Sequence, residues 1–128
     1  MTVFDSNVWI AFLNIEDSQH AKAKKAFAEA SLPIVLPEYV VLEASTVLAK
    51  RASKEIADTF LDRVGSNRDV KILLTDQDFF GQCVAAYRAR TGRALSFADV
   101  ALLVLSAGFE VVTFDAALRA AIRKGNPT

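Results

Sequence analysis

Strand-like and helix-like segments alternate along this chain of 128 residues, and this alternation constrains its fold more than any other feature. Short apolar, strand-like runs cover residues 2–5, 33–36, 69–74 and 110–114. Helical or apolar segments cover residues 8–13, 18–30, 37–50, 53–64, 75–90, 96–107 and 115–124. Strands separated by helices are typical of a parallel sheet that is covered on both faces. We therefore expect an α/β fold with such a sheet.

Polar residues and proline mark the predicted helix starts. Ser18 and Thr75 are predicted N-caps, because serine and threonine side chains accept hydrogen bonds from the first turn. Pro37 is predicted in the first turn of its helix, where a missing N–H costs nothing. Gly92 ends one helix, and Ser96 opens the next, which is strongly apolar.

Composition excludes several kinds of site. Apolar residues make up 52% of the chain, and no linker or composition shift divides it, so we expect a single domain over 1–128. Cys83 is the only cysteine and His20 the only histidine. An intrachain disulfide, a Cys/His zinc site and a Ser-His-Asp triad are therefore excluded. Any metal ion would have to be bound by oxygen atoms.

Charge and hydropathy predict a cytoplasmic protein. The formal net charge is zero, which argues against a protein that coats nucleic acid without specificity. The first residues lack the basic start and long apolar run of a signal peptide. No uncharged stretch approaches the roughly 20 residues needed to cross a bilayer.

Two acidic residues lie in apolar helical surroundings. Glu43 follows Val40 by three residues and precedes Val47 by four, so we expect it to face inward, the alternative being a place at the edge of the apolar stripe. Asp99 belongs to the strongly apolar helix that Ser96 opens. Its alternative role is structural, because Ser96-x-x-Asp99 has the spacing of a capping box.

Two further acidic residues follow strands. The chain reads Val3-Phe4-Asp5 and Thr113-Phe114-Asp115, so each aspartate comes where a strand ends and a helix begins. Each could simply cap its helix. However, ligands of open α/β sheets bind at the carboxyl ends of the strands.

Together the four acids predict a metal site. Two carboxylates about 5 Å apart repel by roughly 3 kcal/mol at an effective dielectric near 20, and a cation turns that cost into binding energy. At least one carboxyl pKa should then be raised. Oxygen ligands select hard ions such as Mg²⁺ or Mn²⁺, which support phosphodiester hydrolysis without a histidine base.

Four short motifs in order resemble the PIN-domain ribonucleases, particularly the toxins of VapBC-type toxin–antitoxin pairs. The motifs are Asp5-Ser6-Asn7, Glu43 on its helix, Ser96-Phe97-Ala98-Asp99 and Thr113-Phe114-Asp115. The resemblance covers essentially the whole chain.

This resemblance implies a three-layer α/β/α fold with a short parallel sheet of about four to five strands. It also implies Mg²⁺- or Mn²⁺-dependent endonuclease cleavage of RNA. The implied catalytic and metal-binding residues are Asp5, Glu43, Asp99 and Asp115, and the supporting residues are Ser6, Asn7, Ser96 and Thr113. Ala116 and Ala117 stand where some relatives carry another acid or polar residue, which argues against a complete second metal site.

The expected partners are an RNA substrate, a cognate protein antitoxin and a second copy of the chain in a homodimer. Two basic groups could contact RNA or form a solvated rim: Arg88, Arg90 and Arg93, and Arg119, Arg123 and Lys124. Three alternatives remain. One is a housekeeping PIN-type nuclease in RNA processing or turnover, and the others are a signalling domain with an acidic pocket and a catalytically inactive binding module.

Overall fold

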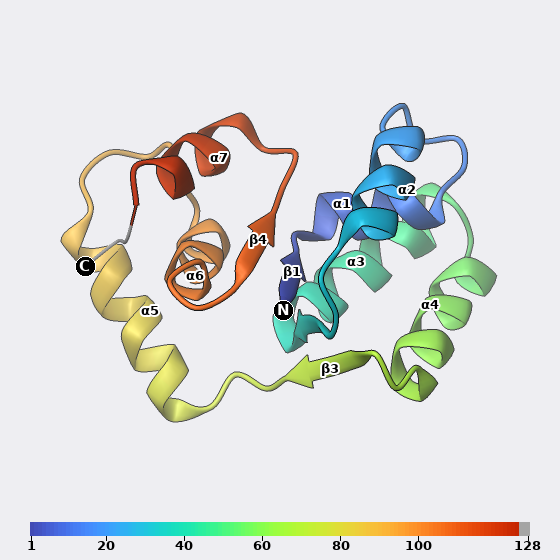
Figure 1. Cartoon of the computed structure of the whole chain (residues 1–128), viewed down its shortest axis with the longest axis horizontal. Helices are drawn as coiled ribbons and strands as arrows, with labels where there is room; N and C mark the ends of the chain where they lie inside the picture. Colours follow the sequence, from blue (N-terminus) through green and yellow to red (C-terminus); the bar gives the residue numbers. More distant parts are fainter. Residues whose placement is uncertain (126–128) are drawn as a thin grey trace.

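Four short parallel strands form one sheet in the order β3-β2-β1-β4 (Figure 1). The computed structural model describes residues 1–125. Its strands are β1 (Thr2–Phe4), β2 (Ile34–Pro37), β3 (Val70–Leu73) and β4 (Glu110–Val112). All of them are parallel, as the alternation of strands and helices predicts, and β1 lies between β2 and β4.

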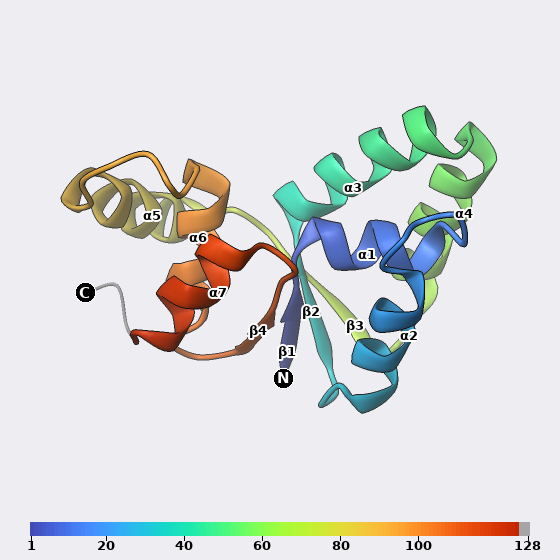
Figure 2. The same cartoon turned by 90° about the horizontal axis from the view of Figure 1, so that it is seen from above.

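Helices cover both faces of this sheet (Figure 2). Helices α1 (Ser6–Leu13), α2 (His20–Glu29), α3 (Glu38–Arg51) and α4 (Lys54–Ser66) lie on one side. Helices α5 (Gln77–Ala89), α6 (Phe97–Leu105) and α7 (Ala116–Arg123) lie on the other. The predicted three-layer α/β/α architecture is confirmed.

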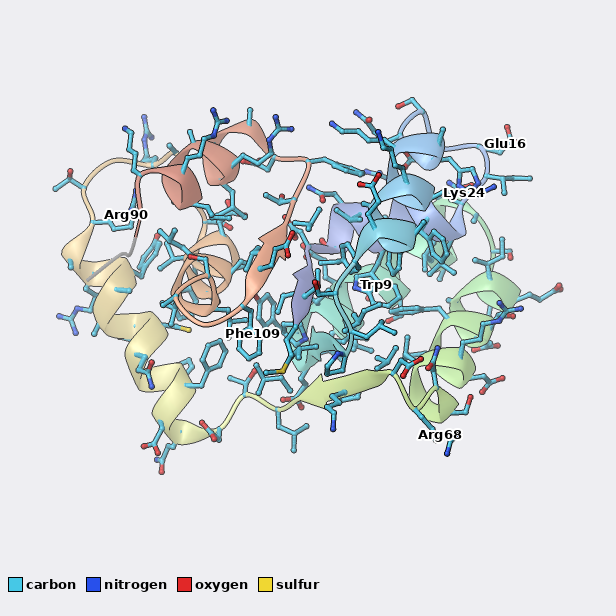
Figure 3. The ribbon with its side chains drawn as sticks, in the orientation of Figure 1. Trp9, Glu16, Lys24, Arg68, Arg90 and Phe109 are labelled. Carbon is cyan, nitrogen blue, oxygen red and sulfur yellow. The ribbon has the colours of Figure 1, made fainter. Side chains whose placement is uncertain are left out.

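The two sides of the sheet carry separate apolar cores, because successive strand residues point to opposite faces. Phe4 packs against α1–α4, where its ring stacks on Phe27 with centroids 4.1 Å apart. Val3 packs against α6 and α7. Trp9 lies within the first core in Figure 3, whereas the labelled Lys24 lies at the periphery. Each fully buried large side chain contributes roughly 1.5–3 kcal/mol.

Helix α6 is the central element of the second core. Five of its nine residues are buried, which agrees with its apolar sequence. It packs against α5 and α7 and follows the turn where Gly92 adopts a φ of 87°, a left-handed conformation that favours glycine.

Three predicted helix starts, at Ser18, Thr75 and Pro37, are wrong by one or two residues. Ser18 does not cap α2, which begins at His20; the Asp17 carboxylate instead accepts a hydrogen bond from the backbone N–H of Gln19. Asp76, not Thr75, caps α5, because its carboxylate is the one that reaches the N–H of Phe79.

Pro37 ends β2 and is the N-cap of α3 rather than a residue of its first turn, since its ψ of 140° is still extended. The last strand is also shorter than predicted. It ends at Val112, and residues 113 and 114 lead the chain out of the sheet toward α7.

No helix in residues 1–125 is long and apolar enough to cross a membrane.

Candidate active site

Asp5 is the most enclosed of the four predicted site acids. It follows β1, caps α1 and is only 8% exposed. Its Oδ1 accepts a hydrogen bond from the backbone N–H of Ser6 at 2.7 Å, and its Oδ2 accepts one from the Thr113 hydroxyl at 2.6 Å. These two donors fix the orientation of the carboxylate at the carboxyl end of the central strand.

A small polar network connects Asp5 to Asp115 across the sheet. Besides donating to Asp5, the Thr113 hydroxyl oxygen accepts hydrogen bonds from the backbone N–H of Asp115 at 3.1 Å and from Asn7 Nδ2 at 3.4 Å. Asn7 Oδ1 accepts the N–H of Phe114 at 3.2 Å. The first and fourth motifs, 106 residues or more apart in sequence, therefore meet where β1 and β4 end.

Asp115 and Asp99 both lie at helix starts and are partly buried. Asp115 caps α7, with its Oδ1 accepting the N–H of Leu118 at 2.8 Å. Asp99 forms a complete capping box with Ser96: Ser96 Oγ accepts the N–H of Asp99, and Asp99 Oδ2 accepts the N–H of Ser96. In each carboxylate the other oxygen, Asp115 Oδ2 or Asp99 Oδ1, accepts no hydrogen bond from residues 1–125.

Glu43 does not face inward, and this prediction is wrong. The buried stripe of α3 consists of Val40, Ala44 and Leu48, four residues apart, and Glu43 lies beside it on the exposed surface. The predicted alternative, a glutamate at the edge of the stripe, describes it correctly. Its charge nevertheless acts on Asp5.

The charges of two other site acids, Asp99 and Glu43, act on the carboxyl group of Asp5. Burial is the largest effect and raises the pKa of the Asp5 carboxyl, while the hydrogen bonds from Thr113 and Ser6 lower it. Repulsion by the negative charges of Asp99 and Glu43 raises it further. The expectation that one site carboxyl has a raised pKa is confirmed, although burial rather than repulsion is the main cause.

The chemical type of the four site acids, which offer carboxylate oxygens, suits a hard divalent cation. The acids offer only oxygen, and no Lys or Arg in residues 1–125 pairs with them; the one ion pair of this region joins Lys54 and Asp58. However, no three acidic, His or Cys side chains among residues 1–125 are gathered closely enough to bind one ion. An ion would therefore have to draw the carboxylates together.

Tyr39 is a neighbour of the site that the sequence reasoning missed. Its hydroxyl donates to the carbonyl of Ala98 at 3.3 Å, directly before Asp99. Burial raises the pKa of this hydroxyl most, followed by the charge of Asp5 and then by Cys83, Glu43 and Asp99. The signal was present in the sequence, because Tyr39 precedes Glu43 by four residues and so shares its side of the helix.

The basic residues divide into near and far groups. Three basic residues and one acidic residue line a shallow groove of ≈ 430 Å³ beside Thr113 and Phe114: Lys22, Lys25, Arg119 and Glu29. The Lys22 ammonium lies 4.8 Å from the centroid of the Phe114 ring. By contrast, Arg90 follows the C-terminal end of α5, which is the end of this helix farther from β1 (Figure 3).

Comparison with known proteins agrees with the observed fold. Curated protein sequences give no match. Among solved structures, the crystal structure of VapC20 from Mycobacterium tuberculosis, described as a sarcin–ricin loop cleaving toxin, is similar to this chain. The two share 22% sequence identity with a TM-score of 0.82, and the match covers 94% of this chain and 95% of that one. The PIN domain family model matches residues 2–124, and the chain therefore belongs to the PIN domain family.

Proposed function

We propose that this chain is a divalent-metal-dependent endoribonuclease and the toxin of a toxin–antitoxin pair. The observation that carries the proposal is the field around Asp5. A buried carboxyl is repelled by two further acids, and no basic residue of 1–125 pairs with any of them. A protein retains such an arrangement at a cost, and a cation that binds there repays it.

In this proposal Asp5, Glu43, Asp99 and Asp115 bind Mg²⁺ or Mn²⁺. When bound, the ion activates water and stabilises the oxygen that leaves the cleaved phosphodiester. The supporting residues hold the carboxylates in place. Ser6 and Thr113 orient Asp5, Asn7 joins the two strand ends, and Ser96 fixes the side chain of Asp99 through the capping box.

Two structural features support details of the proposal. The groove of Lys22, Lys25 and Arg119 borders Thr113, so it can bind RNA phosphates that run past the acids. Ala116 and Ala117 begin α7 directly after Asp115 and are exposed. Because they offer no side-chain ligand there, we propose one complete metal site rather than two.

The toxin role is supported by the similarity to VapC20, which is described as a sarcin–ricin loop cleaving toxin. We extend three properties to this chain as proposals: a cytoplasmic location, a homodimeric state and a protein antitoxin. An antitoxin that places a basic side chain among the unpaired acids would form charge-assisted hydrogen bonds and block the site.

The test of the nuclease is cleavage of single-stranded and loop RNA by the purified chain. Mg²⁺ or Mn²⁺ should support cleavage, EDTA should abolish it, and Asp5→Asn should lack it. Asp58→Asn is the matched control, because Asp58 is an exposed aspartate of α4 whose partner is Lys54. Undiminished cleavage in EDTA or by Asp5→Asn, with contaminating nuclease excluded, would refute the metal mechanism.

The test of the toxin role is growth. Cells that express the wild-type chain without a neighbouring antitoxin gene should grow slowly, whereas cells that express Asp5→Asn should grow normally. Equal growth of both strains, with RNA cleavage intact in vitro, would favour a housekeeping nuclease instead.

A further inference from the structure

An apolar pocket of ≈ 270 Å³ lies between α3, α5 and α6. Its walls include Tyr39, Phe79, Phe80, Phe97, Ala98 and Ala101. For comparison, an engineered apolar cavity of about 150 Å³ binds benzene, so this pocket has room for a larger flat ring system.

Two of the four aromatic residues of this pocket are exposed to solvent, whereas Tyr39 and Phe79 are partly buried. Phe80 is 50% exposed and Phe97 39% exposed, and the two rings meet edge to face with centroids 6.1 Å apart. Single exposed apolar side chains are ordinary, but neighbouring aromatic rings around a hollow mark a surface that binds something.

The pocket shares a wall with the acidic site. The Tyr39 ring lines the pocket, and its hydroxyl donates to the carbonyl of Ala98, the residue before Asp99. The charges of Asp5, Glu43 and Asp99 all act on this hydroxyl. An occupant of the pocket therefore contacts Tyr39 and Ala98, the residue that precedes Asp99 in the chain.

We propose that this pocket binds an unpaired nucleobase of the RNA, adjacent to the phosphodiester at the acidic site; the inference rests on the proposed nuclease function. A nucleobase is flat, aromatic and uncharged, so it can enter an apolar pocket beside carboxylates that would repel an anion. Single-stranded RNA is commonly held by stacking of its bases on aromatic side chains.

The pocket has few groups that could distinguish one base from another. Its other polar side chains are Thr75 and Cys83, and the Tyr39 hydroxyl already donates to Ala98. Stacking of this kind tolerates any base. The pocket therefore positions the RNA strand for cleavage and does not select its sequence.

The experiment measures binding without cleavage. Full-length Asp5→Asn protein is titrated with single-stranded hexamers of adenylate or uridylate, and with an abasic hexamer that carries the same number of phosphates. Both base-containing hexamers should bind more tightly than the abasic one. In the same background, Phe80→Leu with Phe97→Leu should weaken their binding about 5- to 150-fold, the range expected for loss of one stacked base. Binding of the abasic hexamer should not change.

Two matched variants and one spectroscopic signal locate the effect. Phe80→Trp keeps an aromatic surface and should keep the RNA affinity. Leu61→Ala removes an exposed apolar side chain of α4, far from the pocket, and should also leave the RNA affinity unchanged. The methyl NMR signals of Ala98 and Ala101 should shift with a base-containing hexamer, because a stacked ring changes their field. The methyl of buried Ala57 on α4 should not.

Equal binding of base-containing and abasic hexamers would overturn the proposal. An RNA affinity that is unchanged when both Phe80 and Phe97 are replaced by Leu would also overturn it. If the same double variant no longer dimerises while its RNA affinity is unchanged, this face is an interface between two copies of the chain. Failure of the pocket is distinguishable from failure of the proposed function. Wild-type RNA cleavage with ring-independent binding refutes only the pocket, and ring-dependent binding without wild-type cleavage refutes only the nuclease.

Discussion

Replacing Asp99 with Asn separates the two roles that Asp99 combines. The side chain completes a capping box with Ser96, and its charge acts on Asp5. Asparagine has nearly the same shape, and its amide oxygen can still accept the N–H of Ser96, which Asp99 Oδ2 accepts at 3.0 Å. The substitution therefore removes the charge and keeps the cap.

The expected change in stability is small. Loss of a negative charge from the first turn of α6 costs about 0.3–1 kcal/mol, and the lower part of this range applies because Asp99 is partly exposed to solvent. Relief of the repulsion on Asp5 offsets part of this cost. We expect the free energy of unfolding in EDTA to change by less than about 1 kcal/mol, or roughly 4 °C in Tm. Cleavage should fall by at least about 100-fold, which corresponds to 2.7 kcal/mol of transition-state stabilisation.

The assay combines thermal melts in EDTA and in Mg²⁺ with RNA cleavage rates. Mg²⁺ should raise the stability of the wild type by up to about 2.7 kcal/mol at a concentration near 100 times Kd, and should raise that of Asp99→Asn much less. Asp76→Asn is the matched control, since Asp76 caps α5 but is absent from the charges that act on Asp5. If Asp99→Asn melts lower in EDTA by the same amount as Asp76→Asn and cleaves RNA at the wild-type rate, Asp99 is only a cap and the proposed site is wrong.

Two further predictions concern the surroundings of Asp5. Thr113→Val removes the donor to Asp5 Oδ2 and should lower the free energy of unfolding, measured with urea, by about 1–3 kcal/mol. Its control, Thr59→Val on the exposed side of α4, should change this free energy by under about 0.5 kcal/mol. Because the pKa of Asp5 lies above its ordinary value of 3.8, native protein binds this proton more tightly than unfolded protein does. The free energy of unfolding of the metal-free wild type, minus that of Asp5→Asn, should thus fall as pH rises from 3.8 through the raised pKa. A rise of this quantity with pH would contradict the assignment.

The sequence predicts the fold and the strand-end acids because both depend on local patterns. Alternating segments suffice for the parallel sheet, and the segments of Asp5 and Asp115 are joined through Thr113 because the parallel strands β1 and β4 end at one edge. The exposure of Glu43 could not be predicted from the apolar residues around it, since the width of the buried stripe depends on how α1 and α4 pack against α3. The i, i+4 spacing places Tyr39 on the side of Glu43, but the pocket beside Tyr39 depends on contacts between α3, α5 and α6 that no local pattern encodes.

Capping and metal binding, which the sequence presents as alternatives, are compatible in this fold. Helices α1 and α7 follow β1 and β4 and begin at the edge where these strands end, so Asp5 and Asp115, which cap them, lie at that edge. Asp99 lies in the first turn of α6, which follows α5 rather than a strand. Asp5, Asp99 and Asp115 all accept backbone N–H groups at helix starts, where the partial positive charge of the helix N-terminus attracts a carboxylate. The backbone N–H at the start of α1 thus offsets part of the repulsion that Asp99 and Glu43 exert on Asp5. Glu43 lies within α3 and has no such donor in residues 1–125, but it is exposed, so water reduces the cost of its charge. The fold can therefore hold these acids without bound metal, and it leaves Asp99 Oδ1 and Asp115 Oδ2 without a donor in residues 1–125 and available to a cation.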